Sequence, residues 1–339
     1  ETCRPVLGNK VDGIAGKLID LIAVFALLAG TATTFSLATP LLAGAISSVT
    51  GIPQSTGLTL VILVIVCAIY TFSVYFGMKG VQLSAATCTW LFFGLLAYVF
   101  FFGGQTRFII EEGITALGNL TQNFIGLATW TDSLRTSSFP QTWTIFYWAY
   151  WMVWCVAVPF FIGSISKGRT LRQVILGGYV FGLSGTFTSF IIMGNYGLGL
   201  QMHGKLDVLS SYAADGNLYH AILDILGQLP LSKAVLVLLV LCMITFYSTS
   251  FDSITMVAST YTYKELQSDE EPHRNVKLFW AIFLILLPLA LIFSENSMSN
   301  LQTVSIIAAF PVGIIMLLII SSFFKDADAY LKEQANPPE

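Results

Sequence analysis

Long apolar stretches separated by short polar segments run along the whole chain. A helix needs about 20 apolar residues to cross the hydrocarbon core of a bilayer, and eight stretches of this chain meet that requirement. They are roughly residues 16–47, 57–77, 82–103, 142–164, 171–194, 233–259, 276–294 and 302–324. The pattern therefore predicts an all-α, polytopic membrane protein with a single transmembrane domain over residues 1–339.

Two of the polar segments are predicted to form helices that do not cross the membrane. Residues 105–130 are too polar to span, but their apolar residues recur at helical spacing, so we expect an external amphipathic helix at the membrane interface. These apolar residues are Phe108, Ile109, Ile114, Leu117, Leu120 and Phe124. A second helix is expected over residues 219–226, and residues 325–339 are expected to form a frayed cytoplasmic tail.

Composition agrees with a chain that contacts membrane lipid. The 339 residues are 55% hydrophobic and 10% charged, whereas a soluble domain carries roughly 25% charged residues. Because so few charges cannot cover a water-facing surface, lipid must contact much of the chain. The net charge is −3 and no basic stretch is dense, so nucleic acid is not expected as a partner.

The positions of the basic residues predict which segments are cytoplasmic. Lysine and arginine accumulate in the cytoplasmic loops of membrane proteins. If the N-terminal segment is cytoplasmic, the eight spans place 12 of the 16 basic residues on that side and 4 on the other. The external four are Arg107, Arg135, Lys205 and Lys233. We therefore expect a multi-pass plasma-membrane protein with both ends of this chain in the cytoplasm.

The densest aromatic signal lies in the fourth stretch, where residues 143–154 hold four of the chain's seven tryptophans. Five rings there follow the spacing i, i+4, i+7, i+8 and i+11, which places them on one helix face. They are Trp143, Tyr147, Tyr150, Trp151 and Trp154, with Trp148 to one side. Each ring attracts a cation by about 2 kcal/mol or more where water is excluded, so a box of such rings suits a quaternary ammonium. The alternative is an interfacial aromatic belt with core packing, although a belt should occupy about one turn and this stripe runs for about three.

Pro159 lies further along the same stretch. It lacks a backbone donor, so it frees the carbonyl of Cys155 four residues earlier. Transporters use broken helices near the membrane midplane to expose backbone dipoles to a substrate or an ion. An ordinary proline kink is the alternative, and the sequence pattern leaves both open.

The second signal is a polar run at residues 246–255 of the sixth stretch, where most side chains bear a hydroxyl or a carboxyl group. Oxygen ligands suit a hard cation such as Na⁺, and an intramembrane carboxylate such as Asp252 is a functional candidate. Alternatively, the hydroxyls bond back to carbonyls of their own helix, and Asp252 is hydrated near the cytoplasmic end or caps a neighbouring helix.

Thr31, Thr33 and Thr34 stand beside Gly30 in the first stretch. They either line a polar cavity or permit close helix packing, and we expect packing. The sequence contains no nucleophile–base constellation, phosphate loop or HExxH-like pattern, so it does not support an enzyme. No cofactor is expected other than Na⁺ as a coupling ion.

These motifs resemble those of the betaine/choline/carnitine transporter family. Residues 146–154 are similar to its Phe-Tyr-Trp-Ala-Trp-Trp-x-x-Trp helix, and residues 165–172 to the Ile-Ser-Arg-Gly-Arg-Thr loop that follows it. Residues 77–81 resemble its Gly-x-x-(Lys/Arg)-Gly turn, and residues 249–252 its Thr-Ser-Ala-Asp element. The motifs occur in family order and cover nearly the whole chain.

The resemblance implies a LeuT-like inverted-repeat helical bundle of twelve spans in the bacterial inner membrane. This chain would hold eight of the twelve, spans five to twelve, with residues 105–130 linking the two repeats. The family's third and fourth spans, which complete the substrate and ion sites, would then be missing. By analogy with the family, a homotrimer is implied.

The resemblance also implies roles for individual residues. Tyr150, Trp151 and Trp154 would form the substrate box, and Trp143, Phe146 and Trp148 would lie along the pathway or on an outer site. Thr249 and Ser250 would donate side-chain oxygens to Na⁺, with the carbonyl of Phe246 nearby.

The chain departs from the family pattern at two places. Tyr150 stands where the family usually has tryptophan, and Cys155-Val156 replaces a Ser-Pro pair, with Pro159 three residues later. The local unwinding, and any second sodium site there, would therefore differ.

The function implied is secondary active transport of a quaternary-ammonium solute such as betaine, carnitine, γ-butyrobetaine or choline. Retention of the Thr-Ser element favours sodium-coupled symport, while the rest of the stretch looks closer to carnitine-type members. Sodium-independent substrate/product antiport is one alternative. A membrane receptor that binds the same ligands without transporting them is the other.

Overall fold

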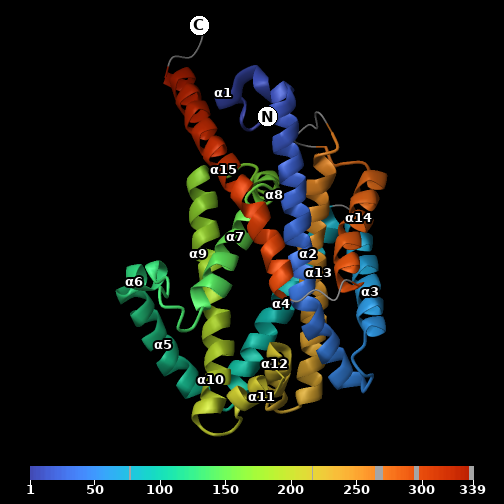
Figure 1. The fold of residues 1–339 in the computed structure, drawn as a ribbon, viewed down its shortest axis with the longest axis vertical. Coiled ribbons are helices and arrows are strands. Elements are labelled where there is room, and N and C mark those ends of the chain that lie inside the picture. Colours follow the sequence, from blue (N-terminus) through green and yellow to red (C-terminus); the bar gives the residue numbers. More distant parts are fainter. Residues whose placement is uncertain (76–77, 216, 264–269, 294–297, 336–339) are drawn as a thin grey trace. The chain divides into compact units, whose positions relative to one another are not determined.

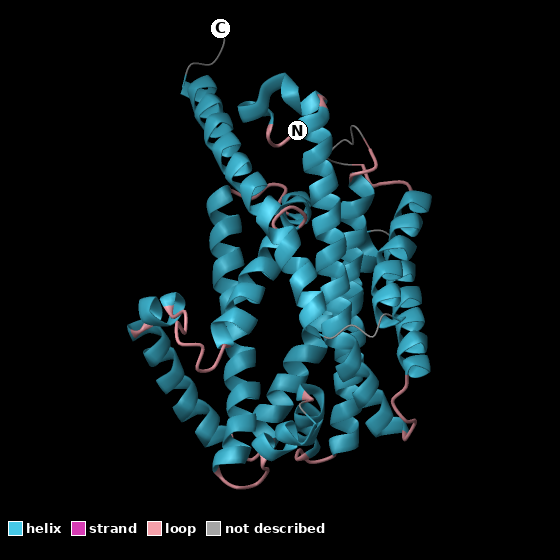
Figure 2. Ribbon diagram, in the orientation of Figure 1, coloured by secondary structure: helices cyan, strands magenta, loops and turns pink. Residues whose placement is uncertain are grey.

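The structure is a computed structural model that describes residues 1–75, 78–215, 217–263, 270–293 and 298–335. The described residues form helices joined by turns and loops, with no strand among them (Figure 2). In chain order (Figure 1), the α-helices are α1 (Arg4–Leu7), α2 (Ile14–Thr50), α3 (Thr56–Tyr75), α4 (Met78–Phe102), α5 (Thr106–Gln122), α6 (Phe124–Thr129), α7 (Ile145–Trp154), α8 (Val158–Ile165), α9 (Leu171–Ser189), α10 (Asn195–Met202), α11 (Val208–Asp215), α12 (Leu218–Gly227), α13 (Ser232–Thr260), α14 (Arg274–Phe293) and α15 (Met298–Ala335). A 3₁₀-helix, η1 (Gly8–Asp12), follows α1, and two π-helical turns, η2 (Pro140–Thr144) and η3 (Phe190–Gly194), precede α7 and α10.

The helices confirm the prediction of an all-α, polytopic membrane protein. Over the described residues, six helical segments are long and apolar enough to cross a membrane. They are Ile14–Thr50, Thr56–Tyr75, Gln82–Phe102, Leu171–Met202, Ser232–Thr260 and Thr303–Ala335. The predicted stretch 142–164 is divided into shorter helices, and the C-terminal part of stretch 276–294 lies outside the described side chains. The motif at residues 77–81 begins outside the described residues.

The chain divides into two compact units. Unit 1 comprises Glu1–Ser36, Asp132–Ile165 and Ile254–Glu339, and unit 2 comprises Leu37–Thr131 and Ser166–Ser253. The predicted substrate box therefore belongs to unit 1, and the predicted sodium ligands belong to unit 2.

Small side chains form the centre of unit 1. Ala23, Ala26 and Ala29 are spaced by three along α2, and all three are buried in one cluster with Val153 of α7 and Val312 of α15. Small residues let helix backbones approach closely, which is a main source of helix association where lipid removes the hydrophobic driving force. This packing brings α2 against the aromatic helix α7.

The core of unit 2 joins the spanning helices to the polar segments between them. Val99 of α4, Ile109 of α5, Leu200 of α10, Leu226 of α12 and Leu239 of α13 are buried in one cluster. Each fully buried aliphatic side chain contributes about 1.5–3 kcal/mol relative to an exposed one. The cluster therefore anchors both α5 and α12 to membrane-crossing helices.

The segments predicted to be non-spanning are largely helical. Residues 105–130 form α5 and α6, in which Ile109 is buried whereas Ile114 and Phe124 are exposed. The helix expected over residues 219–226 lies within α12. The expectation of a frayed tail from residue 325 is wrong as far as Ala335, because α15 continues to that residue. One physical reason is the Lys332–Asp328 ion pair at 2.6 Å, since opposite charges four residues apart stabilise a helix.

Candidate functional site

The aromatic segment is a short helix between two irregularities. The π-helical turn η2 precedes α7, and three residues separate the end of α7 at Trp154 from the start of α8 at Val158. In the break, the N–H of Cys155 donates to the carbonyl of Met152, and the N–H of Ala157 donates to the carbonyl of Trp154. These tighter turns replace the α-helical pattern because Pro159 lacks an N–H for the carbonyl of Cys155. The broken helix that Pro159 suggested is therefore present.

A tyrosine from elsewhere in unit 1 satisfies a carbonyl of this break. The hydroxyl of Tyr261 donates to the carbonyl of Val156 at 3.0 Å, and its ring meets Phe160 edge to face at 5.7 Å. Leaving a buried carbonyl without a partner costs about 1–3 kcal/mol. The Val156 carbonyl is therefore occupied by a protein donor in this state.

The loop before η2 is ordered around the carboxylate of Asp132. This carboxylate accepts hydrogen bonds from the hydroxyl of Thr136 at 2.7 Å and from the backbone N–H groups of Ser137 and Ser138, both at 2.9 Å. These bonds, first the one from the Thr136 hydroxyl, hold the pKa of the Asp132 carboxyl well below its usual range. Because the loop leads directly into Pro140 of η2, Asp132 fixes how the aromatic segment begins.

Tyr150 lies at the centre of the predicted substrate box. Its ring centroid is 6.0 Å from that of Trp151 and 6.0 Å from that of Trp154, with interplanar angles of 75° and 79°. Phe146 lies 5.6 Å from Tyr150 on its other side. The two edge-to-face pairs, Tyr150–Trp151 and Tyr150–Trp154, contribute about 0.5–1.5 kcal/mol each beyond burial. The structure thus brings Tyr150, Trp151 and Trp154 together as one cluster of rings.

The six predicted substrate residues have different surroundings. Phe146 is 2% exposed, whereas Trp151 is 63% exposed and Trp148 is 71% exposed. Tyr150, Trp154 and Trp143 are half-buried. Phe146 therefore acts through packing, while Trp151 has an accessible face that a cation could contact.

Two residues of α2 contact the substrate box. The hydroxyl of Thr34 is 2.7 Å from that of Tyr150, and the backbone of Gly30 lies against the indole of Trp154. The sequence led us to expect simple packing for the three threonines of this stretch. One feature of the sequence could have indicated this contact. Gly30 and Thr34 are four residues apart, about one helical turn, which places both on the same face of α2.

The predicted sodium ligands lie together on α13 in unit 2. The hydroxyl of Thr249 donates to the carbonyl of Phe246 at 3.0 Å, and the hydroxyl of Ser253 donates to the carbonyl of Thr249 at 3.0 Å. Ser250 is exposed. The alternative in which hydroxyls bond back to their own helix thus describes Thr249 and Ser253 in this state.

Asp252 is fully buried within unit 2, so its carboxylate does not face bulk solvent. Its Oδ2 accepts a hydrogen bond from the hydroxyl of Ser73 in α3 at 2.7 Å, and its Oδ1 has no hydrogen-bond partner. Ser73 was not found from the sequence, because 179 residues separate the two partners. The bond fixes the polar face of α13 against α3 within unit 2.

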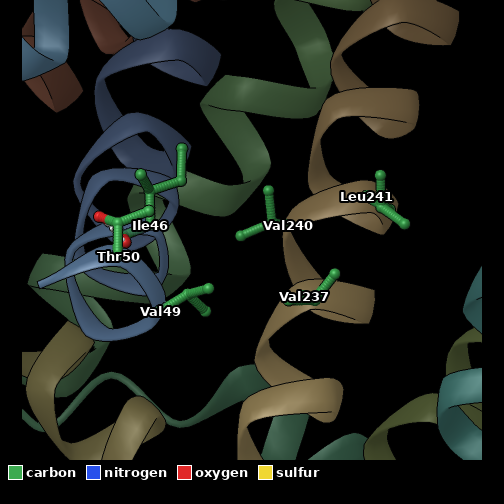
Figure 3. Close-up of a pocket in the computed structure, with 6 residues that line it drawn as sticks. All are labelled: Ile46, Val49, Thr50, Val237, Val240 and Leu241. Carbon is green, nitrogen blue, oxygen red and sulfur yellow. Dashed lines mark hydrogen bonds between the residues drawn. The ribbon is translucent and has the colours of Figure 1, made fainter.

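Unit 2 also contains an apolar pocket that none of these polar residues lines (Figure 3). It has a volume of about 140 Å³ and lies between α2 and α13. Its lining residues are Ile46, Val49, Thr50, Val237, Val240 and Leu241. The hydroxyl of Thr50 is bonded to the carbonyl of Ile46, so the pocket offers neither an aromatic face nor an available donor to a charged solute.

Comparison with known proteins places these features in a family context. The sequence model described as "BCCT, betaine/carnitine/choline family transporter" matches residues 1–332. The chain is 29% identical over 315 residues to a protein of Acinetobacter baumannii named "Carnitine transporter", covering 92% of this chain and 57% of that protein. It is 31% identical over 336 residues to the "Glycine betaine transporter OpuD" of Bacillus subtilis, covering 98% of this chain and 64% of that protein.

A third relative is similar to the same extent. A "Probable glycine betaine transporter" of Desulfitobacterium hafniense is 30% identical over 324 residues, covering 95% of this chain and 64% of that protein. The chain therefore spans less than two thirds of the length of each of these relatives.

Proposed function

Because the chain belongs to the betaine/carnitine/choline transporter family, we propose that it forms part of a secondary active transporter for a quaternary-ammonium solute. Candidate solutes are glycine betaine, carnitine, γ-butyrobetaine and choline. The family is one of transporters and not of enzymes. The observation that carries the proposal is the cluster of Tyr150, Trp151 and Trp154 on the broken aromatic helix.

The chemistry of these rings suits a trimethylammonium group. Such a cation has no N–H to donate, so carboxylates and carbonyls cannot bind it through hydrogen bonds from the nitrogen. Aromatic faces attract it through their quadrupole, by about 0.5–1 kcal/mol per ring at exposed sites and about 2 kcal/mol or more where water is excluded. Trp151, which is 63% exposed, gains most when the site closes around the solute.

Sodium coupling is the proposed driving force. Thr249, Ser250 and the carbonyl of Phe246 supply oxygen ligands of the type that a hard cation takes. They lie within five consecutive residues of α13, with Thr249 bonded to Phe246 at 3.0 Å. On sodium binding, the Thr249 hydroxyl would turn its lone pairs toward the ion and release the Phe246 carbonyl.

The proposal is tested with the protein expressed from its complete gene and reconstituted in proteoliposomes. Uptake of radiolabelled glycine betaine, carnitine and choline is measured under an inward Na⁺ gradient and under a matched K⁺ gradient. We expect accumulation of at least one solute with Na⁺, and a loss of tenfold or more in Trp154→Ala, since removing one desolvated cation–π contact costs about 2 kcal/mol. Undiminished uptake in both Trp151→Ala and Trp154→Ala would contradict the site.

Sodium-independent antiport is the second candidate function. The observation that favours it is the Thr249–Phe246 hydrogen bond, which satisfies the hydroxyl proton of Thr249 and one lone pair of the Phe246 carbonyl without an ion. Antiport predicts solute exchange that is equal in Na⁺ and K⁺ and unchanged in Thr249→Val. Symport predicts that Thr249→Val raises the Na⁺ concentration needed for half-maximal uptake.

A further inference from the structure

Two residues of α2, Gly30 and Thr34, lie directly against the rings of Tyr150 and Trp154. Gly30 and Thr34 are four residues apart, and so are Tyr150 and Trp154, so each pair lies on one face of its helix. Within unit 1 the two faces meet: Thr34 is hydrogen-bonded to Tyr150 at 2.7 Å, and Gly30 lies against the indole of Trp154. The two helices therefore meet through two residue pairs, Thr34–Tyr150 and Gly30–Trp154.

The hydroxyl of Thr34 bonds within its own helix and to α7. It lies 2.9 Å from the carbonyl of Gly30 and 2.7 Å from the hydroxyl of Tyr150. A hydroxyl has one proton and two lone pairs, so Thr34 can pair with the phenol of Tyr150 as acceptor or as donor. In either direction, the bond fixes the ring of Tyr150 to α2.

The second contact depends on the absence of a side chain at position 30. A Cβ there would lie 3.0 Å from Cζ2 and 3.1 Å from Cε2 of Trp154, which is closer than ordinary van der Waals contact. Glycine within a helix costs roughly 1 kcal/mol relative to alanine. At this position it provides the space in which the indole of Trp154 lies.

We propose that Thr34 and Gly30 are positioning residues of the substrate box, where Thr34 fixes Tyr150 through its hydroxyl and Gly30 seats the indole of Trp154. This inference rests on the proposed function, because the rings are positioned for a quaternary ammonium. Cation–π attraction requires the cation to sit over a ring face within about 6 Å of its centroid. Rings that are free to reorient lose part of that attraction, so α2 contributes to affinity without touching the solute.

The test is a double-mutant cycle on the protein expressed from its complete gene and purified in detergent. Binding of tetramethylammonium chloride and of glycine betaine is measured by isothermal titration calorimetry. Thr34→Val and Tyr150→Phe remove the same hydrogen bond from opposite ends, so each is expected to weaken binding about fivefold. The double variant is expected to bind no more weakly than either single variant, and Thr34→Ser, which keeps the hydroxyl, is expected to match the wild type.

Matched controls separate positioning from general effects of the substitutions. Thr186 also donates to a carbonyl four residues earlier, at 2.9 Å, but lies exposed on α9, so Thr186→Val is expected to leave affinity unchanged. A methyl group added at Gly94 of α4 would meet nothing within 4 Å beyond its chain neighbours and the nearby backbone of its own helix. Gly94→Ala is therefore the control for Gly30→Ala, for which a loss of tenfold or more is expected. Losses from Thr34→Val and Tyr150→Phe that multiply in the double variant would overturn the inference, as would unchanged affinity in Thr34→Val.

A measurement without ligand distinguishes this inference from the proposed function. If the wild-type protein binds no quaternary ammonium, the proposed function is contradicted. The positioning role is then still tested by near-ultraviolet circular dichroism of the tyrosine and tryptophan rings. We expect the spectrum to change in Thr34→Val and Gly30→Ala and to stay as in the wild type in Thr186→Val and Gly94→Ala. Identical spectra in all four variants would overturn the positioning role.

Discussion

Aromatic residues that are neighbours in sequence on α7 have opposite surroundings. Phe146 is 2% exposed and its ring lies near those of Trp143, Tyr147 and Tyr150, at 6.4, 5.7 and 5.6 Å. Trp148, two residues further on, is 71% exposed. Two residues correspond to about 200° around a helix, so the two side chains point in nearly opposite directions. Phe146 supports the substrate box from within, and Trp148 does not.

This difference predicts opposite effects of alanine on stability. Phe146→Ala leaves a cavity under Tyr150 and should destabilise the protein by roughly 3–5 kcal/mol, whereas the exposed Trp148→Ala should change stability by about 0.5 kcal/mol or less. A thermal-shift assay on the purified protein measures both. Equal unfolding midpoints for the two variants would contradict the assignment of Phe146 as a packing residue.

At the residue scale, the sequence predicted which residues share a helix face, but it did not predict contacts between residues far apart in the chain. The i, i+4 and i+7 spacing predicted that Tyr150, Trp151 and Trp154 share one region of α7, and their rings do lie 6.0 Å apart around Tyr150. Periodicity carries no information on which face meets another helix. Thr34 pairs with a residue 116 positions away, so the sequence could show only that it shares a face with Gly30.

At the scale of elements, the irregular backbone on both sides of α7 has different origins. The break after Trp154 was one of the two outcomes that Pro159 left open, because proline lacks an N–H and its ring clashes with the carbonyl four residues earlier in either case. The π-helical turn η2 and the Asp132 loop were not predicted. The loop depends on positive φ angles at Asp132, Arg135 and Ser138, which non-glycine residues adopt at a cost of about 1–3 kcal/mol each, so the hydrogen bonds to Asp132 must stabilise it.

Asp132 should therefore make stability depend on pH. Its pKa is lowered in the folded state, first by the Thr136 hydroxyl, so its contribution is fully present above the unfolded pKa of about 3.9 and is lost as the pH falls through the lowered folded value. Asp132→Asn places an amide donor against N–H donors and should lower the thermal midpoint at pH 7. The difference from the wild type should shrink below about pH 4, where the wild type begins to lose its advantage.

Thermal midpoints of wild type and Asp132→Asn between pH 7 and pH 3 check this expectation. Asp328→Asn is the matched control, because it removes an exposed ion pair with Lys332 on α15 that is worth only about 0–1 kcal/mol. A difference between wild type and Asp132→Asn that is constant across the pH range would contradict the role given to the carboxylate.

At the scale of the whole molecule, composition and apolar length were enough to predict the fold class, because a chain with 10% charged residues cannot cover a water-facing surface. Helix length alone does not give the number of membrane crossings. The structure contains six long apolar segments among its described residues, and α7 and α8 are each too short to span. Together, residues 145–165 contain 21 residues, which at about 1.5 Å per residue reach roughly 31 Å, about the thickness of the hydrocarbon core.

We therefore expect α7 and α8 to cross the membrane as one broken span, with α5 outside and the loop before α9 in the cytoplasm. The test is maleimide labelling in a background that lacks the native cysteines, which are Cys3, Cys67, Cys88, Cys155 and Cys242. Gly118→Cys lies on exposed α5 and Arg169→Cys in the exposed loop before α9. A membrane-impermeant maleimide should label the first in intact cells and the second only after permeabilisation, which also shows that both thiols are reactive. Labelling of both from the same side would mean that α7 and α8 re-enter the membrane without crossing it, and the predicted separation of 12 basic residues from 4 would then fail.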